Sequence, residues 1–214
     1  MNIKETRIIL LPIVLCLLCA PFACTSYMAE RHYKKGVACQ NNGDNVQAIE
    51  EFTTTLQYTP EHIDARLAIA AAYESEELLN KAITAYSEAL HYDPTVVQAE
   101  YALGTIYSRL RKWDEALIRY ENAIQKDPEH ARAYYALGSI FKIRKENGKA
   151  ISAYSKAIEI DANYCEAHYQ LSLLYFIEGD FNHARQHADI AVKEYPAAQK
   201  LIVLIEEETK DSKG

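Results

Sequence analysis

The chain repeats itself at a fixed interval of 34 residues, and this period constrains its fold more than any other feature. The segment AEYALGTIY occupies residues 99–107, and AYYALGSIF occupies residues 133–141. The similarity continues downstream, where DEALIRYENAIQKDP at 114–128 is echoed by GKAISAYSKAIEIDA at 148–162. A period in the range of about 20 to 50 residues is the signature of an array of stacked repeats.

Five units of this length fit the sequence without any insertion. Their first residues stand at positions 29, 63, 97, 131 and 165. The eighth place of every unit is small, and the twenty-fourth place is aromatic in the first four units. The twentieth place is always alanine, at Ala48, Ala82, Ala116, Ala150 and Ala184. Four units carry a proline near their end, at Pro60, Pro94, Pro128 and Pro196.

The spacing of apolar residues within a unit predicts two helices. In the first half of the fourth unit, Tyr134, Leu137 and Phe141 recur at the spacing of one helical face. The second half repeats the pattern with Ala150 and Tyr154. Proline near the end stops the second helix or begins the next one, because it cannot donate a hydrogen bond inside a helix. A single helical hairpin cannot bury such a stripe, so each unit is expected to pack on the next.

These residues resemble the tetratricopeptide repeat (TPR) consensus, and the resemblance covers residues 29–198. It implies an all-α fold, a right-handed α-solenoid of five TPR helical hairpins with a C-terminal capping helix and charged tail at 199–214. The first unit departs most from the consensus, with His32, Lys35 and Cys39 where large apolar residues are usual. A polar outer surface on this unit fits a terminal cap.

The first 23 residues have the layout of a secretory signal peptide. A short basic start with Lys4 and Arg7 precedes the apolar run from Ile8 to Ala20. Ala23 and Cys24 then resemble a bacterial lipobox, so we expect the Cys24 thiol to be acylated, with 24–28 as lipidated anchor and short linker. Cys16 and Cys19 follow leucine and fit this motif less well.

The alternative is an uncleaved membrane anchor, a single segment from Ile8 to Cys24. Either way the chain is expected to leave the cytoplasm and stay on a membrane of the bacterial cell envelope. Thr25 stands where lipoproteins retained at the inner membrane usually carry aspartate, which favours the periplasmic face of the outer membrane.

Composition and motifs argue against nucleic-acid binding and catalysis. The formal net charge is −7, whereas nucleic-acid binding needs a basic stripe. HExxH, GxSxG, GxxxxGK and GxGxxG are all absent from the sequence. His183 and His187 have a spacing that suits a metal, but no further ligand lies nearby and exposed polar positions are the preferred reading. We expect no enzyme, cofactor, metal site or Cys39–Cys165 disulfide.

The resemblance also implies a binding face. In this family, places two, five, nine and twelve to thirteen of each first helix line a concave groove that accepts peptides. The groove residues expected here are Tyr101, Thr105, Arg109, Arg132, Tyr135, Ser139, Lys142 and Tyr169. The three bases favour an acidic segment, whereas the second unit offers Asp64 and Glu74, so the groove is expected to change sign along its length. The alternative is that these charges are solvated.

The expected function is therefore that of a non-catalytic scaffold. A membrane-anchored TPR protein of this type captures a protein or peptide of the cell envelope, for assembly of a machine such as a pilus or secretin. The alternative is an accessory or regulatory subunit of an envelope hydrolase or transferase, itself without catalysis. Self-association through the first unit is a further expectation.

Overall fold

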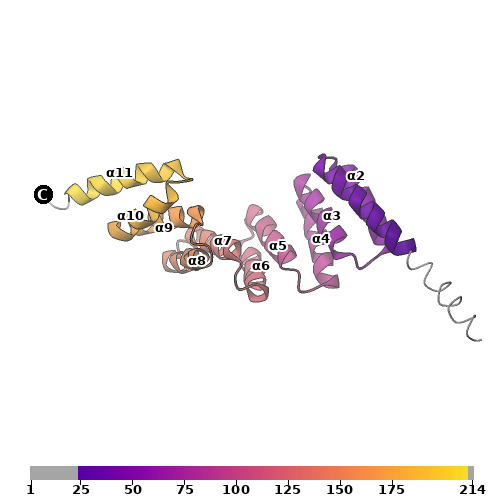
Figure 1. Ribbon diagram of the computed structural model, residues 1–214. Coiled ribbons are helices and arrows are strands. Elements are labelled where there is room, and N and C mark those ends of the chain that lie inside the picture. The colour runs from indigo at the N-terminus through magenta and orange to yellow at the C-terminus, as the bar shows by residue number, and fades with distance from the viewer. Residues whose placement is uncertain (1–23, 212–214) are drawn as a thin grey trace, which may run out of the picture. The chain divides into compact units, whose positions relative to one another are not determined.

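The computed structural model describes residues 24–211, which form helices joined by short turns (Figure 1). The all-α fold of helical hairpins expected from the sequence is confirmed. The chain divides into two compact units, residues 1–99 and 100–214. The signal peptide expected at 1–23 lies outside the described residues. From residue 24 to residue 211, no helix has both the length and the apolar character needed to cross a membrane.

The first unit holds a helix at residues 24–41, α2 (Asn45–Tyr58), α3 (Ile63–Ser75) and α4 (Leu79–Tyr92). Side chains that precede the helices fix where two of them begin. The Asp44 carboxylate accepts the N–H of Gln47 at the start of α2, and the ring of His62 accepts the N–H of Ala65 at the start of α3. Such caps satisfy backbone donors that have no partner within the helix.

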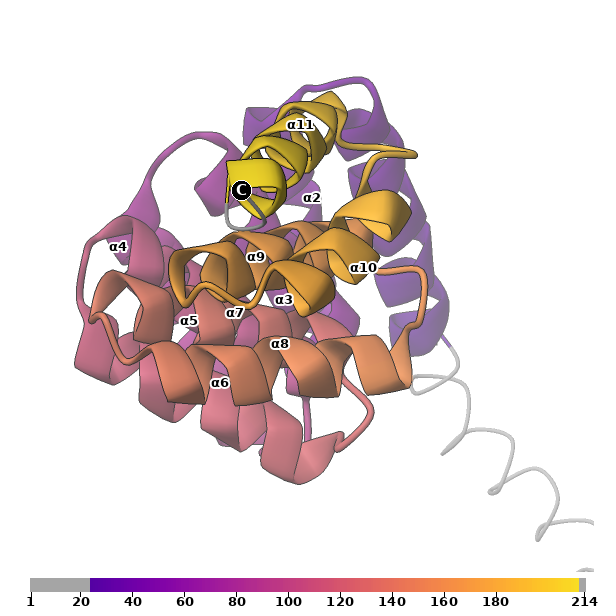
Figure 2. The same cartoon turned by 90° about the vertical axis from the view of Figure 1, so that its left-hand side faces the viewer.

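The second unit continues the same alternation of helices. Its helices are α5 (Val97–Arg109), which begins just before the boundary, α6 (Trp113–Lys126), α7 (Ala131–Ile143), α8 (Asn147–Ile160), α9 (Cys165–Ile177), α10 (Phe181–Ala191) and α11 (Pro196–Asp211). Helices α7 to α10 lie side by side in chain order, each in contact with the next (Figure 2). Helix α11 packs on α10 and α9.

The small residue at the eighth place makes room for the aromatic ring at the twenty-fourth place of the same hairpin. A Cβ atom on Gly36 would lie 2.6 Å from the Phe52 ring, and one on Gly138 would lie 2.7 Å from the Tyr154 ring. Both rings are fully buried. The fifth hairpin has no ring at the twenty-fourth place. It has an alanine there, and the eighth place is occupied by Ser172 instead of glycine or alanine.

The five alanines of the twentieth place are all completely buried. A methyl side chain is therefore what the contact between the two helices of each hairpin accommodates. This explains why the twentieth place does not vary while neighbouring places do. A larger side chain there would force the helices apart, which is the cost of overpacking a well-filled core.

The turn between the two helices of every hairpin contains one residue with positive φ, at the fifteenth place. Glycine occupies it in the first and fifth hairpins, as Gly43 and Gly179 with φ of 80°. The middle three hairpins place Glu77, Arg111 and Lys145 there, with φ of 56°, 57° and 62°. Side chains with a Cβ atom adopt this left-handed conformation at a cost, so the same turn is more strained in the middle hairpins.

Candidate functional site

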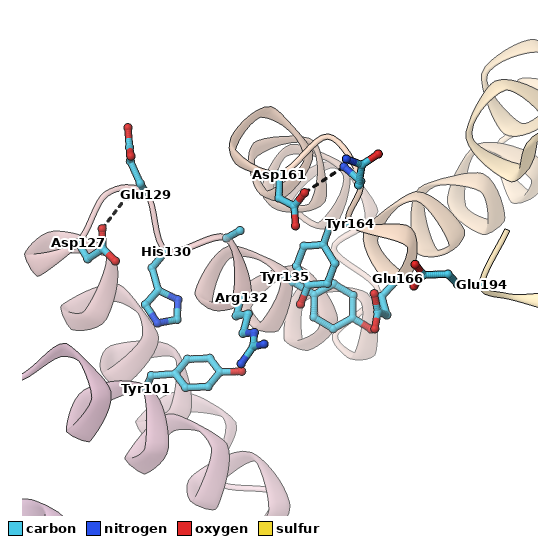
Figure 3. A pocket seen from close by; sticks show the side chains of 12 residues that line it. Tyr101, Asp127, Glu129, His130, Arg132, Tyr135, Asp161, Tyr164, Glu166 and Glu194 are labelled. Atoms are coloured by element: carbon cyan, nitrogen blue, oxygen red, sulfur yellow. Dashed lines mark hydrogen bonds between the residues drawn. The ribbon is translucent and has the colours of Figure 1, made fainter. Parts of the chain in front are cut away.

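A cavity of about 750 Å³ opens in the second unit, at the N-terminal ends of α7 and α9 (Figure 3). Its walls come from the first helices of successive hairpins and from the turns that precede them. The lining residues are Tyr101, Asp127, Glu129, His130, Ala131, Arg132, Tyr135, Asp161, Asn163, Tyr164, Glu166 and Glu194. We call this cavity the tyrosine pocket.

Paired aromatic rings form the apolar part of the tyrosine pocket. Tyr101 packs against His130 with ring centroids 4.9 Å apart, and Tyr135 packs against Tyr164 at 5.2 Å, with the two rings of each pair tilted by 31° and 37°. His130 also caps α7, because its Nδ1 accepts the backbone N–H of Ala133. The capping bond holds the ring of His130 in place, and with it the wall of the pocket.

Similar ring pairs occur outside the pocket. In the first unit Tyr33 lies 4.7 Å from His62, and near the C-terminus Tyr169 lies 5.5 Å from Tyr195. The tyrosines of the fifth place are predicted from the sequence, whereas their ring partners are not. A signal was present, because the thirty-fourth place of the first, third and fourth units holds His62, His130 and Tyr164.

The charges of the tyrosine pocket are mostly negative. Five carboxylates line it against one guanidinium, that of Arg132. Asp127 accepts the backbone N–H of Glu129 at 3.1 Å, and Asp161 accepts that of Asn163 at 3.0 Å, which fixes both turns. Within residues 24–211, none of the five carboxylates forms an ion pair, and Arg132 forms none either.

The carboxylates affect the tyrosines around them. Burial raises the pKa of the Tyr164 hydroxyl, and the nearby charge of Glu166 raises it further. Burial and Glu166 likewise raise the pKa of Tyr195. Figure 3 shows Arg132 directed towards the hydroxyl of Tyr101, with Glu166 and Glu194 beyond the Tyr135–Tyr164 pair. The pocket therefore has a basic group at its Tyr101 end and carboxylates at its Tyr164 end.

Of the groove residues predicted from the sequence, three line the pocket: Tyr101, Arg132 and Tyr135. Thr105 and Ser139 instead hold buried rings of their own hairpins. The Tyr120 hydroxyl donates to the hydroxyl of Thr105 at 3.4 Å, and Tyr154 donates to Ser139 at 3.2 Å. These two hydroxyl groups therefore form hydrogen bonds with tyrosines inside the hairpins.

The three predicted bases do not share one place. Arg132 stands in the first turn of α7, and Lys142 lies ten residues later, about 15 Å along the helix. Lys142 donates to Gln170 on α9, and burial lowers the pKa of its ammonium. Arg109 ends α5, and Tyr169 stacks on Tyr195 outside the pocket lining. Of the three predicted bases, Arg132 alone lines the pocket.

The predicted lipidation residue is exposed. Cys24 is the first described residue and belongs to the helix at 24–41. Its thiol is free, as are the buried thiols of Cys39 and Cys165.

The two histidines of the fifth hairpin have different surroundings. His183 is exposed and bonds the carboxylate of Asp180 at 2.6 Å. His187 is half-buried, and its Nδ1 lies 2.8 Å from Nδ1 of His168, so the expectation of two exposed polar positions is wrong for His187. The described residues contain no group of three or more His, Cys, Asp or Glu side chains that could hold a metal ion.

Comparison with known proteins gives a family and a set of similar folds. The family described as "Tetratricopeptide repeat" matches residues 33–96 and 101–164. No curated protein matches the chain in sequence. A crystal structure of MamA is 25% identical, with a TM-score of 0.68 over 81% of this chain and 94% of that one.

Two further solved structures share the fold at lower identity. Pseudomonas aeruginosa PilF is 20% identical, with a TM-score of 0.76 over 88% of this chain and 87% of that one. YrrB, described as a TPR protein with an unusual peptide-binding site, is 17% identical, with a TM-score of 0.64 over 82% and 90% of the two chains.

Proposed function

From the premise that this chain belongs to the tetratricopeptide repeat family, we propose that it is a scaffold that captures an extended protein segment in the tyrosine pocket. The fold is in general that of a non-catalytic protein-interaction module, and a protein partner follows from it. The observation that carries the proposal is the pocket itself. It joins paired aromatic rings to a guanidinium and carboxylates that have no ion-pair partner among the described residues.

This combination suits a peptide better than a small molecule. The rings offer apolar area at little cost in side-chain entropy, and the charges can orient a backbone or a side chain. YrrB, of the same fold, is described as having a peptide-binding site. An acidic partner was expected from three converging bases, and that expectation loses its basis because only Arg132 lines the pocket.

The second part of the proposal is a membrane anchor. Cys24 is exposed and follows the apolar leader, so a lipid on its thiol would tether the pocket to the bacterial cell envelope. The periplasmic face of the outer membrane is the favoured location, and assembly of a pilus or secretin is the favoured process. Replacing Cys24 with Ala is expected to abolish labelling by a radioactive fatty acid. Label retained on the variant would refute the lipid anchor.

Partner capture tests the pocket. The full chain with a C-terminal tag, solubilised in detergent, serves as bait in an envelope extract. The double variant Tyr135→Ala and Tyr164→Ala is expected to lose the captured protein. The matched control is Tyr27→Ala, which removes an exposed ring from the helix at 24–41. Equal capture by all three baits would overturn the docking site.

A further inference from the structure

The charge of the tyrosine pocket indicates which kind of protein segment can bind there, whereas the fold alone does not. Its five carboxylates lie on turns and first helical turns around the paired rings, whereas Arg132 is the single guanidinium. Asp127 and Asp161 each use one oxygen to bond the turn that follows, so the other oxygen remains available. A pocket of this composition is a negatively charged cavity with aromatic walls.

The position of Glu166 and Glu194 places negative charge beside the rings (Figure 3). In Figure 3, Glu166 and Glu194 lie together beyond the Tyr135–Tyr164 pair. The charge of Glu166 also raises the pKa of three tyrosine hydroxyls, those of Tyr135, Tyr164 and Tyr195, in addition to the effect of burial. Glu166 therefore acts on the whole Tyr164 end of the pocket.

Such surroundings select a cation with an apolar stem. The ammonium of lysine or the guanidinium of arginine is attracted to the face of an aromatic ring, and its methylene groups bury against the same ring. Carboxylates beside the ring complete the site through charge-assisted hydrogen bonds. An acidic segment would instead meet five like charges, and like charges brought together at an interface disfavour binding strongly.

Resting on the scaffold function proposed above, we infer that the partner segment is basic. A lysine or arginine side chain lies against the Tyr135–Tyr164 pair with its charge towards Glu166 and Glu194. Arg132, at the Tyr101 end, bonds a backbone carbonyl or an acidic side chain of the same segment. The two ends of the pocket thus set the direction in which the segment lies.

Peptides of defined charge test this inference on the full chain in detergent. The probes are a fluorescent ten-residue peptide of alternating lysine and leucine, a second with glutamate in place of lysine, and a third with glutamine. Fluorescence anisotropy is expected to give at least tenfold tighter binding for the lysine peptide than for the other two. Its affinity is expected to fall as salt rises, because screening weakens contacts between exposed charges.

Two double variants separate local charge from net charge. Glu166→Gln with Glu194→Gln is expected to weaken binding of the lysine peptide at least tenfold. Glu115→Gln with Glu121→Gln removes the same net charge from exposed positions of α6 outside the pocket and is expected to leave binding unchanged. Equal effects of the two double variants, or tighter binding of the glutamate peptide, would overturn the inference.

A third variant distinguishes failure of the inference from failure of the proposed function. Tyr135→Ala with Tyr164→Ala is measured with the peptide that binds best. If this variant loses binding while the Glu166 and Glu194 variant keeps it, the docking site stands and basic selectivity falls. If both keep binding, the docking site falls as well. Absence of binding by the lysine peptide to the unmodified chain refutes the inference directly.

Discussion

The first and the fifth hairpins fill the same two places with different pairs. In the first, the fourth place is His32 and the twenty-third is Glu51, with His32 Nδ1 2.7 Å from the carboxylate. In the fifth, the same places hold His168 and His187, whose Nδ1 atoms lie 2.8 Å apart. The geometry is shared because the register is shared. The chemistry differs because one pair joins a base to an acid and the other joins two bases.

The two pairs therefore respond to acid in different ways. Bonds from Lys35 and His32 lower the pKa of Glu51. His168 is only 3% exposed, and its Nε2 donates to the carbonyl of Ala162. Burial, with His168 and His183 nearby, lowers the pKa of His187 to about 4. The rings that face His187 are those of His168 and Tyr175, and Asp180 is bonded to His183.

The largest expected effect is the pH dependence of the fifth hairpin. Between pH 6.5 and about 4, His187 binds fewer protons in the folded chain than in the unfolded chain. The free energy of unfolding therefore falls as pH falls through this range, by about 3 kcal/mol from this group. Hydrogen exchange, corrected for intrinsic rates, is expected to report the loss of protection in α9 and α10. The contribution of Glu51 is lost only below about pH 4.5.

Two substitutions of His187 are expected to abolish or reverse the pH dependence of the fifth hairpin. His187→Gln keeps a donor for His168 but cannot titrate, so the loss between pH 6.5 and 4 is expected to disappear. His187→Glu gives the fifth hairpin the base–acid pair of the first, and its protection is then expected to increase as pH falls from 7 to 5. An unchanged pH profile in both variants would refute the assignment to His187.

The next largest effect concerns the eighth place, which is Gly36 in the first hairpin and Ser172 in the fifth. Gly36→Ser copies the fifth hairpin into a site where a Cβ atom would lie 2.6 Å from Phe52. The cost is expected to be about 1–3 kcal/mol, as for other overpacked cores, and thermal or urea unfolding measures it. Gly148→Ser, where no atom lies within 4 Å of the added Cβ, is expected to cost nothing.

A double-mutant cycle tests whether the Phe52 ring causes this cost. In a Phe52→Ala background, the fifth hairpin's combination of serine and alanine is reproduced in the first hairpin. The penalty of Gly36→Ser is then expected to vanish, because the ring that it meets is gone. A penalty that persists in this background would mean that Phe52 is not its cause.

A smaller effect is expected at the fifteenth place, where the terminal hairpins have glycine and the middle ones do not. Lys145→Gly relieves a positive φ of 62° and is expected to stabilise the chain by about 0.5–1 kcal/mol. Gly179→Lys imposes the same conformation on a lysine and is expected to destabilise by a similar amount. Chemical denaturation of the two variants checks the opposite signs.

The smallest effects belong to exposed ion pairs. Lys34 pairs with Glu30 in the first hairpin, whereas Arg185 in the fifth pairs with both Asp189 and Glu206 and so joins α10 to α11. Lys34→Ala is expected to cost less than about 0.5 kcal/mol and Arg185→Ala about 0.5–1 kcal/mol. High salt is expected to remove most of the loss of unfolding free energy in each variant, because these charges are exposed and salt screens them.

The sequence was sufficient to predict the repeated helical hairpins of the fold. Alanine at the twentieth place and a small residue at the eighth are dictated by helix contacts that recur in every hairpin, so a single chain shows them five times. The groove stays a prediction; of its residues, Tyr101, Arg132 and Tyr135 line the pocket, and they stand at the second and fifth places of their units.

The histidine pair and the charge of the tyrosine pocket could not be predicted, because they depend on contacts that the 34-residue period does not reveal. The pairing of His168 with His187 requires knowing that the fourth and twenty-third places face each other across a hairpin. The carboxylates of the tyrosine pocket lie in turns, at Asp127, Asp161 and Glu194, where polar residues are ordinary and attract no attention. Arg132 and Lys142 stand at opposite ends of α7 and Arg109 ends α5, so Arg132 alone of the three predicted bases lines the pocket.

The way the tyrosine pocket draws its walls from successive hairpins has a consequence for how such a chain can change by gene duplication. One 34-residue copy contains a tyrosine such as Tyr101 and its ring partner His130, but Arg132 belongs to the next copy and Glu166 to the one after. Duplicating a unit therefore creates a new combination of walls at the seam between copies, without altering any residue. New specificity can arise from the order of units before a single codon has mutated.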